Sequence, residues 1–313
     1  MKLATSTADL KGYFADDQQR HLEIFSASGF KYLDYSFYRA AEQGSPYIAN
    51  NDLWKREITS IREKADQLGL AFVQAHAPVG TMFEAGEERD ALIQAMLNSI
   101  EACAMLGIPC TVVHAGQHPD PDTTPADFNR INLNFFQIFY AAAEKYQVNL
   151  LVENSCEQNA PRYYLRTGKE MKAFLTMANH PLLHACWDTG HANMRNMDQY
   201  ESLVDLGDDL HAVHINDNFG DRDAHVMPYI GTCNFDQILL ALRDIHYRGA
   251  FTLECGRGLR THDAWPHVRP AFTYQGRPVN KLLDPSDAIV QRYMQLMYEV
   301  GKEMLKQYDL FDG

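Results

Sequence analysis

Several features are scarce or missing in this 313-residue sequence, and each absence narrows its function. No apolar stretch approaches the ~18 residues of a membrane-spanning helix, and the N-terminus carries no hydrophobic signal core. We therefore expect a cytoplasmic protein with no membrane partner. None of the six cysteines forms a C-x-x-C pair. This argues against a structural zinc knuckle and indicates free thiols in a reducing compartment.

Positive charge is also scarce. The 28 Lys and Arg residues are outnumbered by 41 Asp and Glu residues, which gives a net charge of −13, and no basic run interrupts this balance. Such a surface repels a phosphate backbone, so no nucleic-acid partner is expected. A G-x-G-x-x-G fingerprint, the mark of a dinucleotide-binding sheet, is missing as well.

What the sequence does contain is a regular alternation of strand-like and helix-like segments. Short apolar runs of the kind found in strands covered on both faces occur eight times. They are KLATS at 2, KYLDYS at 31, AFVQAHA at 71, CTVVHAG at 110, NLLVENS at 149, LLHACWD at 182, HAVHIND at 211 and AFTLECG at 250. Eight such runs favour a closed barrel over the alternative, an open doubly wound sheet.

The segments between the runs predict helices with recognisable ends. One follows Asn51, a candidate cap, and stops at Gly69; another stops at Gly107. A third, capped by Thr124 with Pro125 at its first position, extends to about residue 147. A fourth lies between Asn234 and Gly249, and a last helix starts near residue 284.

The prediction is therefore an α/β protein, a single (β/α)8 TIM barrel domain over residues 1–313. Two connections are longer than a barrel needs. Residues 37–51 follow the second strand and residues 256–285 follow the eighth. Both leave the carboxyl ends of strands, where the active site of this fold lies, so both are candidate walls or lids.

Polar residues finish six consecutive apolar runs, at the point where barrel strands converge. The strand-end residues are His76, His114, Glu153, Asp188 with His191 just beyond, His214 and Glu254, and the loop after the seventh run adds Asp223 and His225. A single strand-end His or Glu is more often an ordinary structural residue. Seven of them at one topological position make coincidence a poor explanation. Buried carboxylates are costly without a partner, and imidazole plus carboxylate without thiolate suits Zn, Mn, Co or Fe(II).

The pieces VEN, DTGHA, VHINDN and TLECG resemble the xylose-isomerase-like barrels. This superfamily includes sugar and sugar-phosphate isomerases and epimerases, and also the zinc-dependent apurinic-site endonuclease IV family. The resemblance to the ketose 3-epimerases implies one metal held by Glu153, Asp188, His214 and Glu254. It also implies that Glu153 and Glu254 are the catalytic acid–base pair and that His191 binds substrate oxygens.

The endonuclease branch implies a different use of the same residues, with three zinc ions. His76, His114 and Glu153 match the first ion; Glu153, Asp188, His214 and Glu254 match the second; His191, Asp223 and His225 match the third. One to three divalent ions, Zn, Mn or Co, therefore stay open. The negative net charge and the loop HAPVG, which lacks the Tyr-Leu wedge of the endonucleases, favour a sugar enzyme.

The expected function is thus a metal-dependent isomerase or epimerase of a small sugar or sugar phosphate, and the resemblance also allows a homo-oligomer. A trinuclear-zinc hydrolase and a dehydratase acting on a keto-polyol are the alternatives. Arg257 and Arg260 follow the eighth run and are candidates for binding a phosphate or carboxylate of the substrate. An equally good interpretation makes them surface arginines in a polar loop.

Overall fold

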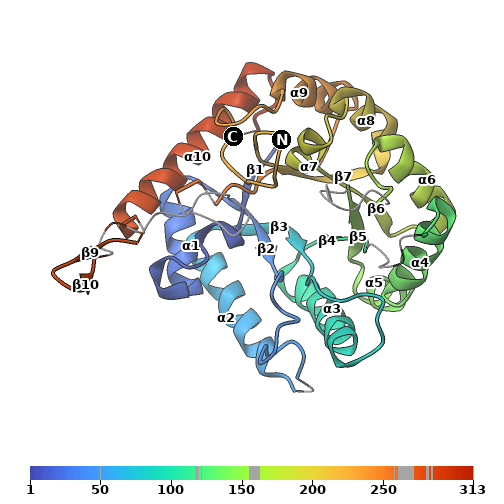
Figure 1. The fold of residues 1–313 in the computed structure, drawn as a ribbon, viewed down its shortest axis with the longest axis horizontal. Helices are drawn as coiled ribbons and strands as arrows, with labels where there is room; N and C mark the ends of the chain where they lie inside the picture. The colour runs from blue at the N-terminus through green and yellow to red at the C-terminus, as the bar shows by residue number, and fades with distance from the viewer. Residues whose placement is uncertain are drawn as a thin grey trace.

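The computed structural model describes residues 1–312 except 50, 117–119, 121, 155–162, 257, 260–270, 280–281 and 283–284. Parallel strands form a closed barrel in the order β1 to β8, sealed by the pairing of β1 with β8 (Figure 1). The strands are β1 Leu3–Ser6, β2 Tyr32–Ser36, β3 Ala71–His76, β4 Cys110–Val113, β5 Asn149–Glu153, β6 Leu183–Asp188, β7 Leu210–Ile215 and β8 Phe251–Leu253. Each lies within one of the eight predicted runs or extends it by one residue, and the predicted (β/α)8 fold is confirmed.

Helices surround the strands (Figure 1). They are α1 Gln18–Ala27, α2 Leu53–Leu68, α3 Glu87–Leu106, α4 Pro125–Gln137, α5 Tyr140–Tyr146, α6 Gly168–Ala178, α7 Thr189–Met194, α8 Gln199–Leu206, α9 Phe235–Asp244 and α10 Asp287–Gln307, with short 3-10 turns at Thr7–Leu10, Phe14–Asp16 and Gly207–Asp209. In the described parts of the chain, none of these helices is both long and apolar enough to cross a bilayer. The five cysteines that the structure describes are free thiols, as expected.

Several predicted helix ends are confirmed by the caps that form there. Thr124 accepts a hydrogen bond from Asp127 N at the start of α4, and Asn234 caps α9 in the same way. Gly69 and Gly107 end α2 and α3 in the left-handed conformation, which costs glycine little.

Three helix predictions were wrong in detail. The segment 125–147 is two helices, because residues 138 and 139 tighten into i→i−3 hydrogen bonds that separate α4 from α5. Helix α9 ends at Asp244 rather than at Gly249, where a Cβ would lie 2.1 Å from Tyr247 Oη. Helix α2 is preceded by Asp52 as its N-cap residue, although Asn51 Oδ1 does accept a hydrogen bond from Leu53 N.

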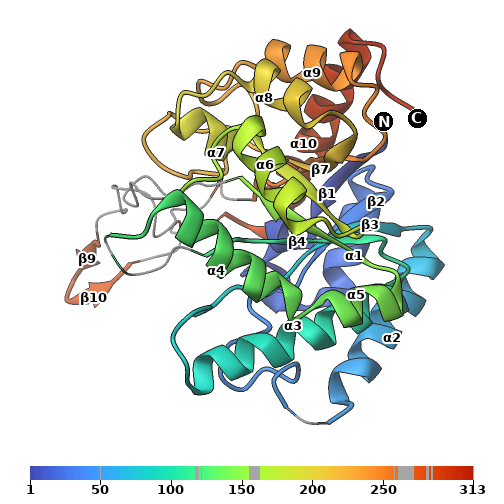
Figure 2. The same cartoon turned by 90° about the vertical axis from the view of Figure 1, so that its right-hand side faces the viewer.

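The long connection after β8 contains a hairpin that the sequence did not predict. Strands β9 (Thr273–Tyr274) and β10 (Arg277–Pro278) are joined by Gln275 and Gly276, both with positive φ, as a two-residue hairpin turn requires. Figure 2 shows the hairpin projecting from the barrel on the side away from the two termini. Strands of two residues are too short to give a periodic signal in the sequence.

The register of the barrel brings some of its polar residues side by side on neighbouring strands. Asp188 pairs with His214 across β6 and β7, and Asp34 pairs with Ser6 on one side and Gln74 on the other. Paired residues of neighbouring parallel strands point to the same face. Their side chains therefore meet inside the barrel at its carboxyl end.

Candidate metal centre

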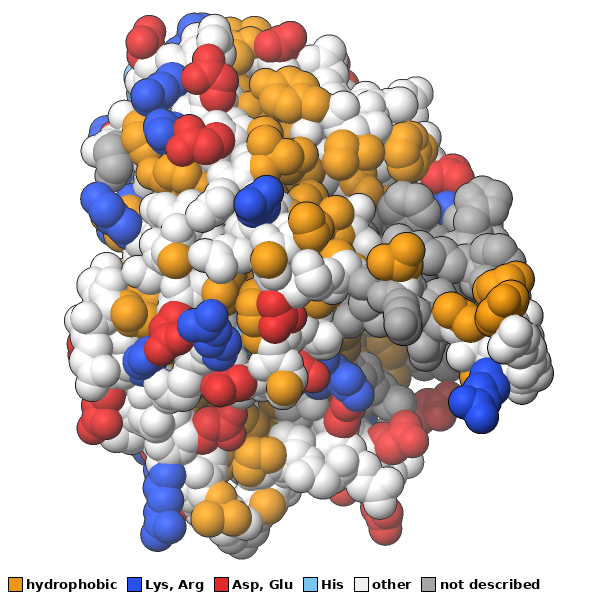
Figure 3. Space-filling model, turned by 90° about the vertical axis from the view of Figure 1, so that its left-hand side faces the viewer, with side chains coloured by type: hydrophobic (Ala, Val, Ile, Leu, Met, Phe, Trp, Pro, Cys, Tyr) orange, Lys and Arg blue, Asp and Glu red, His pale blue; other side chains and the backbone are white. Residues whose placement is uncertain are grey.

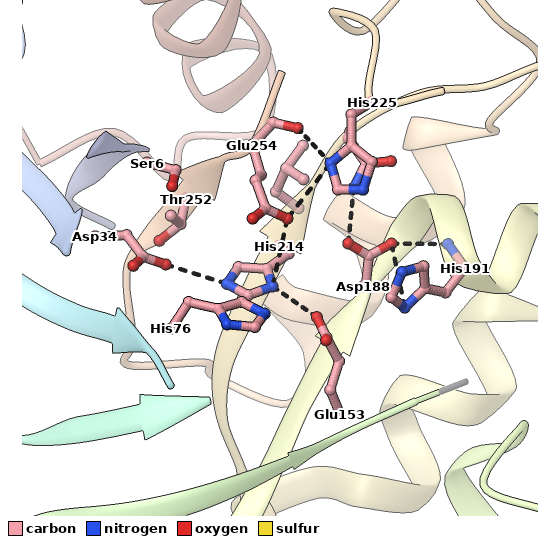
Figure 4. A network of polar contacts seen from close by, with 12 residues as sticks. Ser6, Asp34, His76, Glu153, Asp188, His191, His214, His225, Thr252 and Glu254 are labelled. Atoms are coloured by element: carbon pink, nitrogen blue, oxygen red, sulfur yellow. Dashed lines mark hydrogen bonds and ion pairs between the residues drawn. The ribbon is translucent and has the colours of Figure 1, made fainter. Parts of the chain in front are cut away.

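The predicted site residues come together at the carboxyl ends of the strands (Figure 4). Three groups of residues have potential ligand atoms within 4.8 Å of one another: His76, His114 and Glu153; Asp188, His214 and Glu254; and Asp188, His191 and His225. Asp223 Oδ2 lies 2.9 Å from His225 Nε2. All nine residues singled out in the sequence thus surround one region. Arg257 and Arg260 lie outside the described residues.

A fourth group places the Cys186 thiol beside Glu153 and His214. Cys186 is fully buried beside Glu153, its register partner on β5, and burial raises the pKa of its thiol to about 12. The other three groups offer only the oxygen and nitrogen donors that the sequence predicts.

Three histidines share an orientation that exposes one particular nitrogen to the centre. The Nδ1 atoms of His76, His191 and His225 lie 2.8–2.9 Å from the backbone oxygens of Ala77, Asn154 and Glu254. A carbonyl oxygen only accepts hydrogen bonds, so each Nδ1 carries the proton. In the neutral ring, Nε2 is then an unprotonated donor atom, which is the arrangement of metal-ligating histidines.

At the first group, three side chains bring atoms that could bind an ion close together. His114 Nε2 lies 2.6 Å from Glu153 Oε2, and this oxygen is buried without a hydrogen bond of acceptable geometry among the described residues. His76 Nε2 is 3.1 Å from the same His114 nitrogen. Burial and the repulsion of His114 lower the pKa of His76 to about 4, which keeps its ring neutral near pH 7. A cation among these three atoms would satisfy all of them.

His214 is turned the opposite way, and a residue overlooked in the sequence explains why. Its Nε2 lies 3.1 Å from Oδ2 of Asp34, on β2, while Nδ1 faces Glu153 Oε1 at 2.6 Å. Asp34 is fully buried, and the same Oδ2 accepts a hydrogen bond from Gln74 Nε2 at 2.9 Å. Thr252 Oγ1 donates to Gln74 Oε1 and so fixes the amide. Asp34 therefore holds a proton on His214 Nε2 and leaves Nδ1 for a ligand.

Replacing Asp34 by Asn should weaken metal binding about 10–100-fold, the usual effect of losing the hydrogen-bond partner of a ligand histidine. The amide that Asp34→Asn introduces can donate to His214 Nε2 and thereby move the ring proton to Nδ1. Competition of the protein with a coloured chelator for Zn²⁺ measures the affinity. Asp66→Asn, on the exposed side of α2, is the matched control. Equal affinities for the two variants would contradict this role of Asp34.

The segment Asp188–Met194 combines a strand end with a helix start. Asp188 ends β6 and caps α7, because its Oδ1 accepts a hydrogen bond from His191 N at 2.7 Å. Asn216 Nδ2 donates to the other oxygen, Oδ2, at 2.7 Å, and Asn154 bonds the Asp188 backbone on both sides. These two asparagines directly follow the ends of β5 and β7. Their roles were not predicted from the sequence, because the nearby Glu and His residues give the stronger signal of a metal site.

The packing around position 190 leaves no room for a side chain, so glycine is required there. A Cβ at position 190 would lie 1.9 Å from Asn216 Oδ1. Gly190→Ala should therefore displace Asn216 from Asp188 and lower the free energy of unfolding by about 1–3 kcal/mol, as overpacking usually does. Thermal unfolding measures the loss. Gly80→Ala is the control, since a Cβ there meets Leu92 at an ordinary 3.5 Å, and equal stability of the two variants would refute the requirement.

The loop that carries Asp223 and His225 is anchored by backbone hydrogen bonds, although it belongs to none of the predicted strands. Asp217 and Val226 form an antiparallel bridge with backbone bonds of 2.8 and 3.0 Å. The Asp217 carboxylate accepts further bonds from Gly231 N and Cys233 N. His225 adopts a positive φ of 47° and turns its ring toward the centre.

The two glutamates differ in surroundings and in acidity. Burial opposes charge on Glu153, yet His214 and His114 hold its pKa well below the usual value. Burial raises the pKa of Glu254, and its contacts are looser: Oε2 lies 3.7 Å from His214 Nδ1 and 3.4 Å from His225 Nδ1. The Glu153 side chain is 2% exposed and that of Glu254 is 17% exposed. Glu254 is therefore the more accessible and the more readily protonated carboxylate.

A cavity of about 950 Å³ opens on the centre. Seven of the predicted site residues line it: His76, His114, Glu153, His191, Asp223, His225 and Glu254. Asp188 and His214 lie beneath them and are fully buried. The site thus combines buried carboxylates and imidazoles with space for a small molecule, as binding sites in this fold do.

Comparison with known proteins shows what the chain as a whole is similar to. The chain matches the family described as "Xylose isomerase-like TIM barrel" over residues 22–270. An L-ribulose 3-epimerase from Methylomonas sp. is 26% identical over 231 residues, 69% of this chain and 75% of that protein. A probable endonuclease 4 from Citrifermentans bemidjiense is 26% identical over 229 residues, 64% of this chain and 78% of that protein. A crystal structure of the IolI protein with a bound zinc atom is 15% identical, with a TM-score of 0.73 over 100% of both chains.

Proposed function

The chain belongs to the xylose isomerase-like TIM barrel family, and we propose that it is a divalent-metal-dependent isomerase or epimerase of a small sugar or sugar phosphate, working as one domain over residues 1–313. The observation that carries the proposal is the orientation of the histidines. His76, His191 and His225 each have Nδ1 bonded to a backbone oxygen. Their Nε2 atoms lie near other candidate ligands: His76 Nε2 is 3.1 Å from His114 Nε2, and those of His191 and His225 are 3.9 and 2.9 Å from the oxygens of Asp223. The similarity to an L-ribulose 3-epimerase supports the sugar chemistry.

Glu153, Asp188, His214 and Glu254 would hold the central ion, and the remaining histidines with Asp223 could hold up to two more. The donor set of imidazole and carboxylate suits Zn, Mn or Co, and zinc is bound in a solved structure of the same fold. When bound, the ion would polarise a carbonyl and stabilise the negative charge that develops beside it.

We assign Glu254 as the general base that takes the proton from the substrate. A base must reach the carbon next to the carbonyl, and Glu254 is the carboxylate that opens into the cavity. Each oxygen of Glu153 lies 2.6 Å from a histidine nitrogen, Oε2 from His114 and Oε1 from His214, so candidate metal ligands enclose this carboxylate. We therefore assign Glu153 chiefly to ligand binding and to proton return on the opposite face of the carbon. His191, whose Nε2 faces the cavity, orients substrate oxygens.

A zinc hydrolase of the endonuclease type is the second candidate, because three ligand groups surround the centre and an endonuclease 4 is among the relatives. The negative net charge of the molecule disfavours DNA as a substrate. On the face seen in Figure 3, the described Lys and Arg residues are interspersed with Asp and Glu and form no continuous basic stripe. With a net charge of −13, the attraction that holds a duplex is missing.

The test is the exchange of a substrate hydrogen with solvent. The protein is stripped with a chelator, reloaded with Mn²⁺, Co²⁺ or Zn²⁺, and incubated with ketoses and ketose phosphates in D2O. We expect deuterium at the carbon beside the carbonyl only in the reloaded samples, detected by NMR or mass spectrometry. Cleavage of an abasic duplex without any exchange would select the hydrolase instead, and a product with one hydroxyl fewer would select the dehydratase.

A further inference from the structure

A further buried carboxylate, that of Asp9, lies beside the metal centre without belonging to it. Asp9 follows β1 in the 3-10 turn Thr7–Leu10, is 5% exposed and lines the cavity together with Glu254 and Gly256. It is in none of the groups of potential ligand atoms found among the described residues. Burying a carboxylate costs free energy unless hydrogen bonds compensate for it, so the partners of Asp9 indicate its role.

The two oxygens of Asp9 join the first strand of the barrel to the segment that follows the last. Oδ2 accepts a hydrogen bond from Thr5 Oγ1 at 2.7 Å, and Oδ1 accepts one from Gly256 N at 2.8 Å. Thr5 forms the final pair of the β1–β8 register, with Leu253. Asp9 therefore continues the closure of the barrel by a side chain, beyond the point where the backbone pairing of β1 with β8 ends.

The segment held by Asp9 carries Glu254, and its other contacts come from different directions. Glu254 N donates to Ile215 O at 3.0 Å, and the Glu254 backbone oxygen accepts a hydrogen bond from His225 Nδ1 at 2.9 Å. Tyr293 Oη, on α10, donates to the backbone oxygen of the next residue at 3.1 Å. These bonds come from β7, the loop after it and α10, and Asp9 supplies the contact on the side of β1.

The approach of Asp9 to this segment is close enough to require glycine. A Cβ at position 256 would lie 2.4 Å from Asp9 Cα. A side chain there would push the segment away from β1 and break the hydrogen bond to Asp9 Oδ1. The two residues thus form one contact that depends on both of them.

The carboxylate of Glu254 depends on this backbone for its position. Its Oε2 lies 3.7 Å from His214 Nδ1 and 3.4 Å from His225 Nδ1, and both distances exceed those of ordinary hydrogen bonds. A side chain held so loosely follows its backbone when the backbone moves. A hydrogen bond two residues further along the chain can therefore decide where the carboxylate lies.

We propose that Asp9 is a positioning residue, which holds Gly256 N and thereby places the Glu254 carboxylate at the metal centre. The inference rests on the proposed function in one respect, since it takes Glu254 as a ligand of the central ion. Asp9 acts through the backbone of the segment after β8 and touches neither the ion nor the substrate. It is to Glu254 what Asp34 is to His214, although it acts on the main chain instead of the side chain.

Two substitutions of Asp9 test the proposal through the affinity for Zn²⁺, measured by competition with a coloured chelator. Asp9→Ala removes the acceptor of Gly256 N and should weaken binding about 10–100-fold, as the loss of a residue that orients a ligand usually does. Asp9→Asn keeps an oxygen for Gly256 N and turns its amide toward Thr5 Oγ1, which can accept, so its affinity should stay within about threefold of the wild type. Equal losses in both variants, or no loss in Asp9→Ala, would overturn the proposal.

A double-mutant cycle with Glu254→Ala distinguishes positioning from a general structural role. Once the Glu254 carboxylate is absent, Asp9→Ala has no ligand left to misplace, so it should change the affinity for Zn²⁺ by less than about twofold. Losses that multiply in the double variant would show that Asp9 supports the whole site, and the proposal would be wrong.

Gly256→Ala reaches the same contact from the other side, should Asp9→Ala not fold. Its Cβ would displace the segment from Asp9, so the same loss of affinity and the same dependence on Glu254 are expected. Wild-type affinity in a folded Gly256→Ala protein would overturn the proposal.

Deuterium uptake from D2O separates this inference from the proposed function. The expected loss of Zn²⁺ affinity, without uptake by any sugar in the wild type, would retain the role of Asp9 and refute the isomerase. Uptake in the wild type, with unchanged affinity in Asp9→Ala, would support the isomerase and refute the inference.

Discussion

Replacing Glu254 by Gln should slow deuterium exchange into the substrate by about 10²–10⁴-fold, the usual contribution of a positioned general base. The Gln side chain keeps an oxygen near His214 and His225, so the ion should still bind. What it lacks is the ability to take a proton. Rates of exchange at saturating sugar and metal, measured by NMR in D2O, give the ratio directly.

Glu299→Gln is the matched control for this experiment, because it makes the same chemical change on the exposed surface of α10, where Glu299 pairs with Lys302. Its exchange rate should equal that of the wild type. Should Glu254→Gln retain more than about a tenth of the wild-type rate with the metal bound, the base must be another group, and Glu153 becomes the first choice.

The dependence of the exchange rate on pH tests the role of Glu254 independently. Burial raises the pKa of Glu254, and the nearby charges of Glu153 and Asp188 add to the rise against the attraction of His214 and His225. A base acts in its ionised form, so the wild-type rate should increase as the pH rises through the pKa of Glu254 in the metal-loaded protein, which the positive charge of the ion would lower. In Glu254→Gln the exchange rate should not show this rise with pH. A rise at the same pH in the variant would mean that another residue causes it.

The strands and the polar residues at their ends could be predicted from the sequence for one physical reason. Strands covered on both faces are apolar along their whole length, so a carboxylate or imidazole at the end of each run stands out. Asp188 and His214 are such residues, and their register places them side by side on neighbouring strands. The same reasoning predicts the fold, because a closed barrel brings six strand ends around one cavity.

Residues that act through another side chain could not be found in this way. Asp34 lies inside an apolar run, where one acidic residue gives no indication of its partner 180 positions away, His214. Asn216 and Gly190 have their roles only because the start of α7 meets the segment after β7, and spacing along the chain does not encode that contact.

Comparing His214→Ala with His76→Ala should reveal how many ions the reaction needs. His214 faces Glu153 and Glu254 at the centre of the site, and its loss removes a donor of the central ion. We expect the exchange rate to fall more than about 10³-fold, since a Lewis-acid ion contributes several kcal/mol to the barrier. Metal analysis of the dialysed protein should show the loss of that ion.

His76 belongs to a separate group, with His114 and Glu153, the first of the three sets of ligand atoms. If one ion performs the isomerisation, His76→Ala should lose at most one ion and less than about tenfold in rate, because the central donors Asp188, His214 and Glu254 stay intact. A loss as large as that of His214→Ala would mean that the ions act as a unit. Glu153 would then be needed as a ligand and could not return a proton, and the ions would supply the water activation that a hydrolase needs.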